Sequence, residues 1–364
     1  MPDLKTIRAG IAKLPEGPPL VVALVGATSG IGSYVAKTWA KTFAAHGSKL
    51  RVYIVGRNVT RAEALLKYGR ETSPGSDWRF VPVTDLSLLN EVDQVSMTIS
   101  QEEEASPFAG GPPRIDALYL SPALSPLQES KGNQHPSVPV SKHLPSRIVT
   151  SEGLDSQMSL LYYSRMRFIQ NLTPLLLASS ETAHVVSIFA GNMEDGIKPG
   201  EDPIGTPPAE TYGITSVRRN ICFMKTFYFE ELAEKHAGKI SFVHIYPGLV
   251  DGEGFYSDVQ PKWFRAVWPV FKILLSWYMT NPKDCGDVMV FLATKRYPAK
   301  SGETGTVQAA YSSQRQLGGG AYAVGQRGDE SKDVSWAKAR REDTGARVWE
   351  HTKKTLENII AKGV

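Results

Sequence analysis

Short, continuous apolar segments alternate along this chain with longer segments whose apolar residues recur at helical spacing. The first pair is the β-branched run "PLVVALVG" (19–26) and the helical pattern of "ATSGIGSYVAKTWAKTFAAHG" that follows it. A second run, "KLRVYIVGR" (49–57), precedes another helical segment that begins after Asn58, a residue type that caps helices. The pattern predicts a buried strand, a glycine turn and a helix, then a second strand and helix.

Four further segments have the apolar character of these two runs. They are Arg79 to Val83, Ala117 to Leu120, His184 to Ile188 and Ile240 to Tyr246, and helical material separates each from the next. Strands that alternate with helices form parallel sheets, because each crossover helix packs on a face of the sheet. The expected fold class is α/β, a Rossmann-type doubly wound parallel sheet of about seven strands in a single domain with loop insertions and a C-terminal helix.

Three polar segments interrupt this alternation, at 100–113, 122–145 and 191–210. They are rich in proline, glycine, serine and charge, and surface insertions of this kind often build substrate sites. We expect an N-terminal extension over 1–18, a nucleotide-binding and catalytic domain over 19–330, and a mostly helical tail over 331–364 that docks on the domain.

Composition narrows the function classes. The 41 basic and 37 acidic residues nearly cancel, so the formal charge of +4 gives no reason to expect a nucleic-acid partner. Two cysteines are too few for a disulfide framework or a thiolate metal site, and we expect no metal. The first 20 residues lack the apolar core of a signal peptide, and no apolar run reaches the ~18 residues of a membrane span. A cytoplasmic protein is expected.

The first predicted turn reads Gly26-Ala27-Thr28-Ser29-Gly30-Ile31-Gly32. It lies where a buried strand passes into a helix, so the helix offers free N–H groups and the positive end of its dipole. Glycines there let the backbone approach a pyrophosphate closely. A tight turn without a ligand is the alternative, but the strand before it and the helix after it favour a nucleotide site. The expected contacts are Gly26, Thr28, Ser29, Gly30, Ile31 and Gly32.

Three residues separate the first two glycines, a spacing that resembles the short-chain dehydrogenase/reductase family. Asp85-Leu86 is similar to the family's adenine-contacting aspartate and its neighbour, and Pro247-Gly248-Leu249-Val250 to its Pro-Gly turn beside the nicotinamide. Segments 152–176 and 346–356 resemble the fourth helix and the tail of its retinol-dehydrogenase-like branch. The resemblance covers roughly residues 19–360, and it implies cofactor contacts from Asp85, Leu86, Pro247, Gly248 and Val250.

The residue at the end of the second predicted strand selects between NAD and NADP. An acidic side chain would bind the ribose hydroxyls of NAD, whereas a guanidinium pairs with the 2′-phosphate of NADP. This chain has Arg57-Asn58 there. The expected cofactor is therefore NADP(H), bound by Arg57 with Asn58, Thr28 and Ser29 as helpers. A solvated surface arginine is the alternative interpretation.

The catalytic half of the site matches the family only in part. The resemblance implies a tyrosine that transfers a proton, a lysine four residues later, a serine and an asparagine. Tyr212 fits the tyrosine, but Ser216 stands at the lysine position. The lysine matters because a phenol with a pKa of about 10 is a poor base near neutral pH without a neighbouring cation. The serine, the asparagine and a nicotinamide-binding threonine are replaced by Ile188, Leu161 and Gly252.

Three explanations of these replacements stay open. A register shift of one residue would make Ser187 the catalytic serine, so Tyr212 and Ser187 are the candidate catalytic residues. Activation from elsewhere is the second, but Arg218 and Arg219 lie six and seven residues beyond Tyr212, and we do not expect them to point at the same place. The third is a bound nucleotide without an ordinary redox step.

Other acid/base groups are weaker candidates. For the two histidines a structural role is favoured, and the segment "DGEG" is most simply a polar loop. The residues concerned are His184, His244, Asp195, Asp251 and Glu253.

Segment 263–279, "WFRAVWPVFKILLSWYM", holds three of the seven tryptophans. It follows the Pro-Gly turn, where the family inserts substrate-covering helices, so we expect a lid within 253–282 over a large hydrophobic small molecule. A membrane-surface helix and a dimer contact are the competing interpretations, and they leave a homo-oligomer open.

The leading expectation is thus an atypical NADP(H)-dependent short-chain dehydrogenase/reductase that acts on a hydrophobic small molecule. A non-redox enzyme on the same scaffold, such as an isomerase, cyclase or dehydratase, is the alternative. A catalytically silent nucleotide-binding protein is the third.

Overall fold

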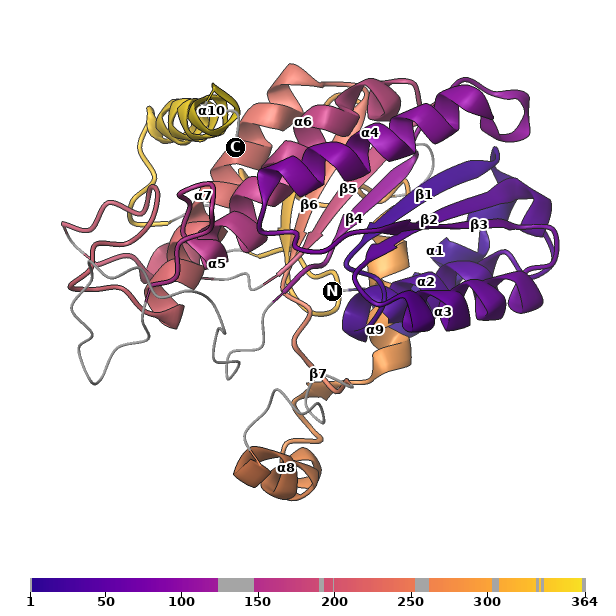
Figure 1. The fold of residues 1–364 in the computed structure, drawn as a ribbon, viewed down its shortest axis with the longest axis horizontal. Helices are drawn as coiled ribbons and strands as arrows, with labels where there is room; N and C mark the ends of the chain where they lie inside the picture. The colour runs from indigo at the N-terminus through magenta and orange to yellow at the C-terminus, as the bar shows by residue number, and fades with distance from the viewer. Residues whose placement is uncertain are drawn as a thin grey trace.

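The computed structural model describes residues 2–123, 147–189, 193–198, 200–252, 262–302, 308–331, 334 and 337–361. A parallel sheet in the order β3-β2-β1-β4-β5-β6-β9 runs through its centre (Figure 1). Its seven strands are β1 (Leu20–Val25), β2 (Leu50–Gly56), β3 (Asp77–Pro82), β4 (Ala117–Leu120), β5 (Ala183–Ile188), β6 (Ile240–Ile245) and β9 (Ala321–Val324). The fold class expected from the sequence is confirmed.

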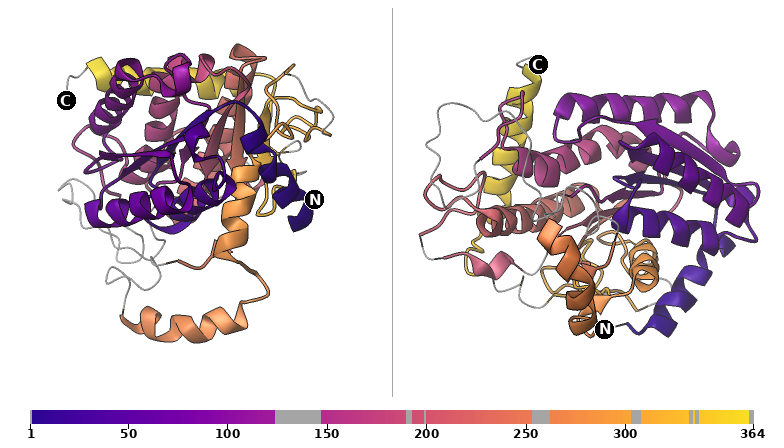
Figure 2. Two further views of the ribbon diagram at one scale, coloured as in Figure 1. Left: turned by 90° about the vertical axis from the view of Figure 1, so that its right-hand side faces the viewer. Right: turned by 60° about the horizontal axis from the view of Figure 1, so that its bottom comes forward.

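Apolar side chains on both faces of the sheet explain why helices cover it on two sides. On β1, Val21 and Ala23 join one hydrophobic core, while Val22 and Leu24 join the other. Figures 1 and 2 show the two helical layers that bury these faces. One layer contains α1 (Leu4–Ala12), α2 (Gly30–Thr42), α3 (Val59–Thr72) and α9 (Pro282–Phe291), and the other contains α4 (Leu89–Ala105), α5 (Ser156–Met158), α6 (Ser164–Leu177) and α7 (Ile214–Lys235).

The C-terminal helix α10 (Thr344–Ala361) lies against α7 on the outside of the second layer (Figure 1). Trp349 of α10 stacks on Tyr228 of α7 with ring centroids 4.9 Å apart. Deeper in the contact, the hydroxyls of Tyr162 and Thr352 form a 2.7 Å hydrogen bond. These contacts attach the tail to the helices beneath it.

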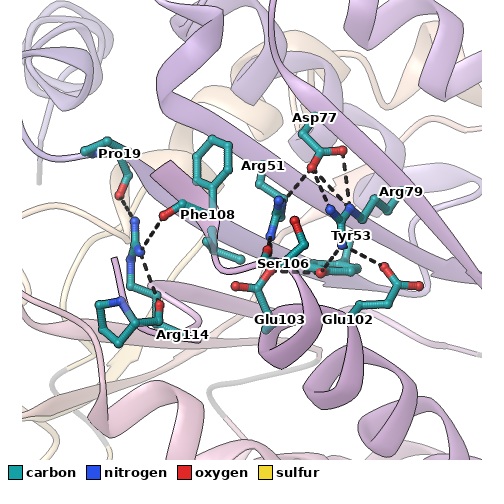
Figure 3. A network of polar contacts seen from close by, with 12 residues as sticks. Pro19, Arg51, Tyr53, Asp77, Arg79, Glu102, Glu103, Ser106, Phe108 and Arg114 are labelled. Carbon is teal, nitrogen blue, oxygen red and sulfur yellow. Dashed lines mark hydrogen bonds and ion pairs between the residues drawn. The ribbon is translucent and has the colours of Figure 1, made fainter. Parts of the chain in front are cut away.

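The segment expected to be a loop from residue 100 is helical at its start, because α4 continues to Ala105. A buried ion pair explains the extra turn: Glu103 of α4 is fully buried and accepts a 2.8 Å hydrogen bond from Arg51 of β2. Figure 3 shows the network around this pair, in which Tyr53 also donates to Glu103 and Asp77 pairs with Arg51. Removing one partner of such a pair would leave a buried charge uncompensated, so the network fixes the end of α4 against β2.

His184 gives the sheet a pH-dependent contribution to stability. It lies on β5 between β4 and β6, its Nε2 atom has no hydrogen-bond partner within the described residues, and burial lowers its pKa from 6.5 to about 4. A base with a lowered pKa binds its proton more readily in the unfolded chain. The contribution of neutral His184 to the free energy of unfolding is therefore fully present above pH 6.5, and it is lost as the pH falls through 4.

Between pH 7 and pH 4 the free energy of unfolding of the wild type should fall by about 3 kcal/mol because of His184 alone. The variant His184→Asn has no imidazole to protonate, so its free energy of unfolding should fall by about that much less. Urea unfolding of both proteins across that range measures it. The pH profile of the variant should be flatter than that of the wild type, and parallel profiles would show that His184 does not carry this contribution.

The strand order reverses between β1 and β4, so the chain leaves these two strands in opposite directions. In open α/β sheets, ligands bind in the crevice that such a reversal opens at the carboxyl ends of the strands. At this edge the backbone of Gly26, after β1, meets that of Pro122, after β4: a Cβ on Gly26 would lie 2.8 Å from the Pro122 nitrogen. The two walls of the expected nucleotide site therefore meet here.

Candidate active site

The glycine turn between β1 and α2 has the geometry that a phosphate group needs. Gly26 adopts φ +79°, a conformation that favours glycine, and Gly30 adopts φ +57° with open space where a Cβ would project. Ser29 is the N-cap residue of α2 but makes no capping hydrogen bond to the helix. The first N–H groups of α2 are thus left for an anion, at the positive end of the helix dipole.

Gly32 brings α2 close to the sheet. A Cβ at this position would lie 2.7 Å from the Gly26 oxygen, the Ala27 Cα and the Ser121 Oγ. Any larger residue would push the start of α2 away from the end of β1, and with it the N–H groups of the turn. Ile31 is partly buried and packs against the core that contains α2 residues.

The end of β2 borders the same turn. A Cβ on Gly56 would lie 2.4 Å from the Thr28 side chain, so glycine here admits Thr28 above β2. Arg57, the next residue, is exposed. Asn58 accepts a 2.9 Å hydrogen bond from the Arg61 N–H and caps α3, as its residue type suggested. Because Arg57 directly follows Gly56 and its side chain is exposed, the guanidinium is accessible to a phosphate bound beside Thr28 and Ser29.

Asp85 and Leu86 follow β3 at the same edge of the sheet. Asp85 is exposed and accepts hydrogen bonds from both the N–H and the hydroxyl of Ser87, each at 2.8 Å. Leu86 is buried in the core. The Asp85 side chain orders its own loop, and its contact with an adenine stays a prediction.

The Pro-Gly turn after β6 returns the chain to the glycine turn. Gly252 lies so close to α2 that its Cβ would be 3.4 Å from the Tyr34 hydroxyl and 3.9 Å from the Gly30 Cα. The Pro247 carbonyl accepts a 3.2 Å hydrogen bond from Thr280, and Val250 is buried. The Pro-Gly segment and the glycine turn thus border one site.

Tyr212, the matched catalytic tyrosine, is buried and bound to a carboxylate. Its hydroxyl donates a 2.8 Å hydrogen bond to Asp155, the buried N-cap residue of α5. Burial and the negative charge of Asp155 raise the pKa of Tyr212 far above its ordinary value. Arg147, whose Nε is 3.7 Å from Asp155, lowers the pKa of Tyr212 by its charge, but this effect is smaller than those of burial and Asp155. This environment opposes a phenolate.

Ser216 does not replace the function of a lysine. Its hydroxyl donates to the carbonyl oxygens of Thr211 and Gly213, at 2.7 and 3.0 Å, and closes the first turn of α7. Leu161, at the asparagine position, is buried in the π-helical turn Ser159–Tyr163 that precedes α6. Neither side chain carries an acid/base group to the site.

Ser187 is fully buried on β5 and is held by Arg165 of α6. The Arg165 guanidinium donates to the Ser187 hydroxyl at 2.8 Å, and to the carbonyl oxygens of Leu120, Ile188 and Pro122 at 2.9, 3.0 and 2.6 Å. Burial lowers the pKa of Arg165 to about 9. The guanidinium joins the carboxyl ends of β4 and β5, and a catalytic role of Ser187 stays a prediction.

Comparison with known proteins identifies the family. The chain is 49% identical over 368 residues to the short-chain dehydrogenase/reductase SAT2 of Stachybotrys chartarum, which covers 100% of this chain and 99% of the relative. This chain belongs to the short-chain dehydrogenase/reductase family. The oxidoreductase AN1596 of Emericella nidulans is 28% identical over 375 residues and covers 99% of each chain. No family model matches the sequence.

Solved structures of this short-chain dehydrogenase/reductase fold resemble the chain despite low identity. L-Sorbose reductase of Gluconobacter frateurii, in complex with NADPH and L-sorbose, superposes with a TM-score of 0.53 at 18% identity, over 86% of this chain and 97% of the reductase. The likeness shows that the fold is shared.

Sequence reasoning missed a fully buried lysine on α7. Lys225 of α7 is fully buried, and its Nζ has no hydrogen-bond partner within the described residues. It lies 4.9 Å from the ring centroid of Phe189, which follows β5. Burial and the charge of Arg165 lower the pKa of Lys225 well below its ordinary value, and burial raises the pKa of nearby Glu194. No spacing from Tyr212 in the sequence pointed to this group.

The remaining acid/base candidates are placed as follows. His244 is buried on β6, with its Nδ1 4.0 Å from a Glu194 oxygen. Asp195 accepts a hydrogen bond from the Lys338 N–H at 2.8 Å. Arg219 donates to the Gly196 carbonyl oxygen and pairs with Glu201. Glu253 lies outside the described residues.

The segment expected to cover the substrate contains α8 (Lys262–Leu274), which projects from the body of this family member beyond the small sheet of β7 (Leu249–Val250) and β8 (Met279–Thr280) (Figures 1 and 2). Residues 253–261 lie outside the described residues. Trp268 is buried, but the other large apolar side chains are mostly exposed: Trp263, Val267, Val270, Phe271, Ile273, Leu274, Trp277 and Tyr278. No helix among the described residues is long and apolar enough to cross a membrane.

Asp251 connects α8 to the nucleotide side of the site. Its carboxylate accepts hydrogen bonds from Trp268 at 3.3 Å and from Lys272 at 2.5 Å, both on α8. Its backbone oxygen accepts a 2.9 Å hydrogen bond from Tyr34 on α2. The position of α8 therefore depends on the helix whose N-terminus borders the glycine turn.

Proposed function

We infer that the protein is an NADP(H)-dependent oxidoreductase that interconverts a carbonyl and an alcohol on a hydrophobic small molecule. The observation that carries this proposal is the uncapped N-terminus of α2 behind the glycine turn, with Arg57 exposed at the end of the neighbouring strand. The N-terminus of α2 can bind the pyrophosphate of the dinucleotide, and the Arg57 guanidinium can bind its 2′-phosphate. The oxidoreductase names of the relatives support the same reaction class.

The residues present fit a dinucleotide in one orientation. Gly26, Gly30 and the N–H groups of α2 would hold the pyrophosphate, while Arg57 and Thr28 would take the 2′-phosphate over β2. The other half would extend over β4, β5 and β6 toward the Pro-Gly turn. When bound there, the reduced nicotinamide supplies a hydride.

The exposed apolar surface of α8 supports a hydrophobic substrate. Among the described residues most of its large side chains are exposed, and contiguous exposed apolar patches mark binding sites. Hydrogen bonds from Trp268 and Lys272 to Asp251 connect α8 to the chain just after the Pro-Gly turn. Membrane-surface contact and dimerisation through α8 stay predictions. Both cysteines are free, which supports a reducing compartment such as the cytoplasm.

A non-redox reaction is the second candidate, and one observation favours it. Tyr212, Ser187 and Ser216 all have their hydroxyls engaged by protein groups within hydrogen-bond distance. An isomerase, cyclase or dehydratase on this scaffold would not need the family's phenol beside the nicotinamide.

Isotope transfer separates these reaction classes. The holoenzyme is supplied with NADPH that carries deuterium at the transferable position, together with a panel of apolar monoketones headed by acetophenone, whose reduction leaves the transferred deuterium on a stereogenic carbon. We expect stereospecific appearance of deuterium on the carbinol carbon of the product. Turnover by cofactor-stripped enzyme would establish the non-redox alternative. NADPH binding with no labelled product from any ketone would favour a silent nucleotide-binding protein.

A further inference from the structure

The helix α8 has two unlike faces. Trp268 is buried, and its indole N–H and the Lys272 ammonium, one turn further along, both donate to the Asp251 carboxylate. Four large apolar side chains of the same helix are 58–74% exposed, and we call them the outer face of α8: Trp263, Val270, Ile273 and Leu274. At about 100° per residue, all four lie within about 60° of the direction opposite Trp268. The attachment through Asp251 therefore turns the outer face away from the attached side.

Aromatic side chains stand at both ends of this apolar surface. Trp263 lies at the start of α8, while Trp277 and Tyr278 lie just before β8 and are 82% and 41% exposed. Tryptophan and tyrosine have an apolar ring and a polar tip, so they are enriched where an apolar medium meets water. Figures 1 and 2 show α8 apart from both helical layers. This arrangement is typical of a helix that lies in a membrane interface.

Charge distinguishes between the possible occupants of the outer face. Segment 262–280 contains three charged side chains, and all are basic: Lys262, Arg265 and Lys272. Asp251, which binds Lys272, lies on the attached side of the helix. Two copies packed through this helix would bring like charges together, whereas the head groups of anionic lipids attract them. An apolar face on a basic helix therefore favours an anionic bilayer over a second copy of the chain.

The length of α8 determines how it can meet a bilayer. The helix has 13 residues, fewer than the ~20 that cross the hydrocarbon core. A short helix with one apolar face lies in the plane of the interface, with that face at the boundary between the head groups and the acyl chains.

We propose that the outer face of α8 docks this protein on an anionic phospholipid bilayer. The docking goes beyond the proposed redox function and does not depend on it. Asp251 connects α8 to the chain just after the Pro-Gly turn, so docking would hold that turn near the membrane surface. A hydrophobic substrate dissolves in the same bilayer, which makes the two proposals compatible.

Vesicle flotation with the full-length protein tests the docking. One set of vesicles is phosphatidylcholine with about one third phosphatidylserine, and the other is phosphatidylcholine alone. We expect binding to the anionic vesicles, and binding at least about tenfold weaker to phosphatidylcholine alone, because the basic residues of α8 then lose their negative partners. Absence of binding, or equal binding to both sets of vesicles, would overturn the proposal.

Two isoleucine variants show whether the outer face is responsible. Ile273→Glu should weaken binding to the anionic vesicles at least about tenfold, because it removes a large apolar side chain from the contact and adds a negative charge. Ile360→Glu is the matched control, since Ile360 is exposed on another helix, α10. It adds the same charge and should change binding less than about twofold. Equal losses in the two variants would contradict docking through the outer face.

Tryptophan quenching shows whether the helix enters the bilayer. Anionic vesicles with brominated acyl chains should quench the fluorescence of the bound protein, and Trp277→Phe should reduce that quenching. Trp349→Phe should not reduce it, because Trp349 stacks on Tyr228 at the contact of α10 with α7. Bound protein whose fluorescence is not quenched would be held by charge alone, and that result would overturn docking through an apolar face.

Sedimentation identifies the competing occupant. A wild-type dimer that Ile273→Glu dissociates, together with no binding to vesicles, would assign the outer face to a second copy of the chain and overturn the proposal. These measurements use neither substrate nor nucleotide, so failure of the redox function would leave their outcome unchanged.

Discussion

Arg165→Met should lower the free energy of unfolding by about 3 kcal/mol or more, because four acceptors at the ends of β4 and β5 lose their donor. Each buried acceptor left without a partner costs about 1–3 kcal/mol. The variant also no longer buries a guanidinium, which offsets part of that sum. Urea or guanidinium unfolding measures the difference.

Two further variants show whether the loss of stability comes from the planar guanidinium and its several donors or from the positive charge alone. Arg165→Lys keeps a cation but cannot reach four acceptors at once, so it should lose most of the same stability. Arg167→Met, two residues along α6, breaks the pair with Asp93, whose carboxylate is exposed enough to be hydrated in the variant, and should cost about 1 kcal/mol. Equal losses for Arg165→Met and Arg167→Met would show that the buried guanidinium does not join the two strands.

Arg57→Asp should weaken NADPH binding about 100-fold and NADH binding by much less. A hydrogen-bonded pair with a charged group contributes about 1.5–3 kcal/mol, and 2.7 kcal/mol corresponds to about 100-fold in Kd. The aspartate would also repel the 2′-phosphate, whereas it could accept hydrogen bonds from the ribose hydroxyls of NADH. Fluorescence titration with both nucleotides measures the ratio.

Lys67→Asp is the matched control for this charge reversal. Lys67 is exposed on α3, where it pairs with Glu71 at 3.9 Å. Its replacement by aspartate changes the net charge by the same amount as Arg57→Asp. It should leave both nucleotide affinities within about twofold, because surface charges at a distance are screened by salt. Equal losses of NADPH and NADH affinity in Arg57→Asp would remove the case for 2′-phosphate recognition.

Much of the fold follows from local pattern. The six strands located from the sequence are mostly apolar segments that alternate with helical ones, so local pattern was enough to find them; β4 (Ala117–Leu120) matches its expected bounds. The strand β9 (Ala321–Val324) is as short as β4 but has no helical segment directly before it, and its pairing with β6 makes it a strand. The extra turn of α4 depends on the pair of Glu103 with Arg51, which no local pattern shows.

The site divides in the same way. The glycine turn is local, so a motif in seven consecutive residues predicted the uncapped helix N-terminus that the structure has. The carboxyl edge of β5 and β6 is bordered by α6 and α7, and the charged groups there come together only in three dimensions. Three cations from α6 and α7 lie over the Phe189 ring: Arg165, Arg218 and Lys225. Their positions in the sequence relative to Tyr212 did not predict this cluster.

Calorimetric titration of the wild-type protein with NADPH, and then with NADH, tests the central claim most directly. The glycine turn, the free N-terminus of α2 and Arg57 together require one NADPH per chain, bound at least about tenfold more tightly than NADH. Absence of NADPH binding, or equal affinity for the two nucleotides, would contradict the account.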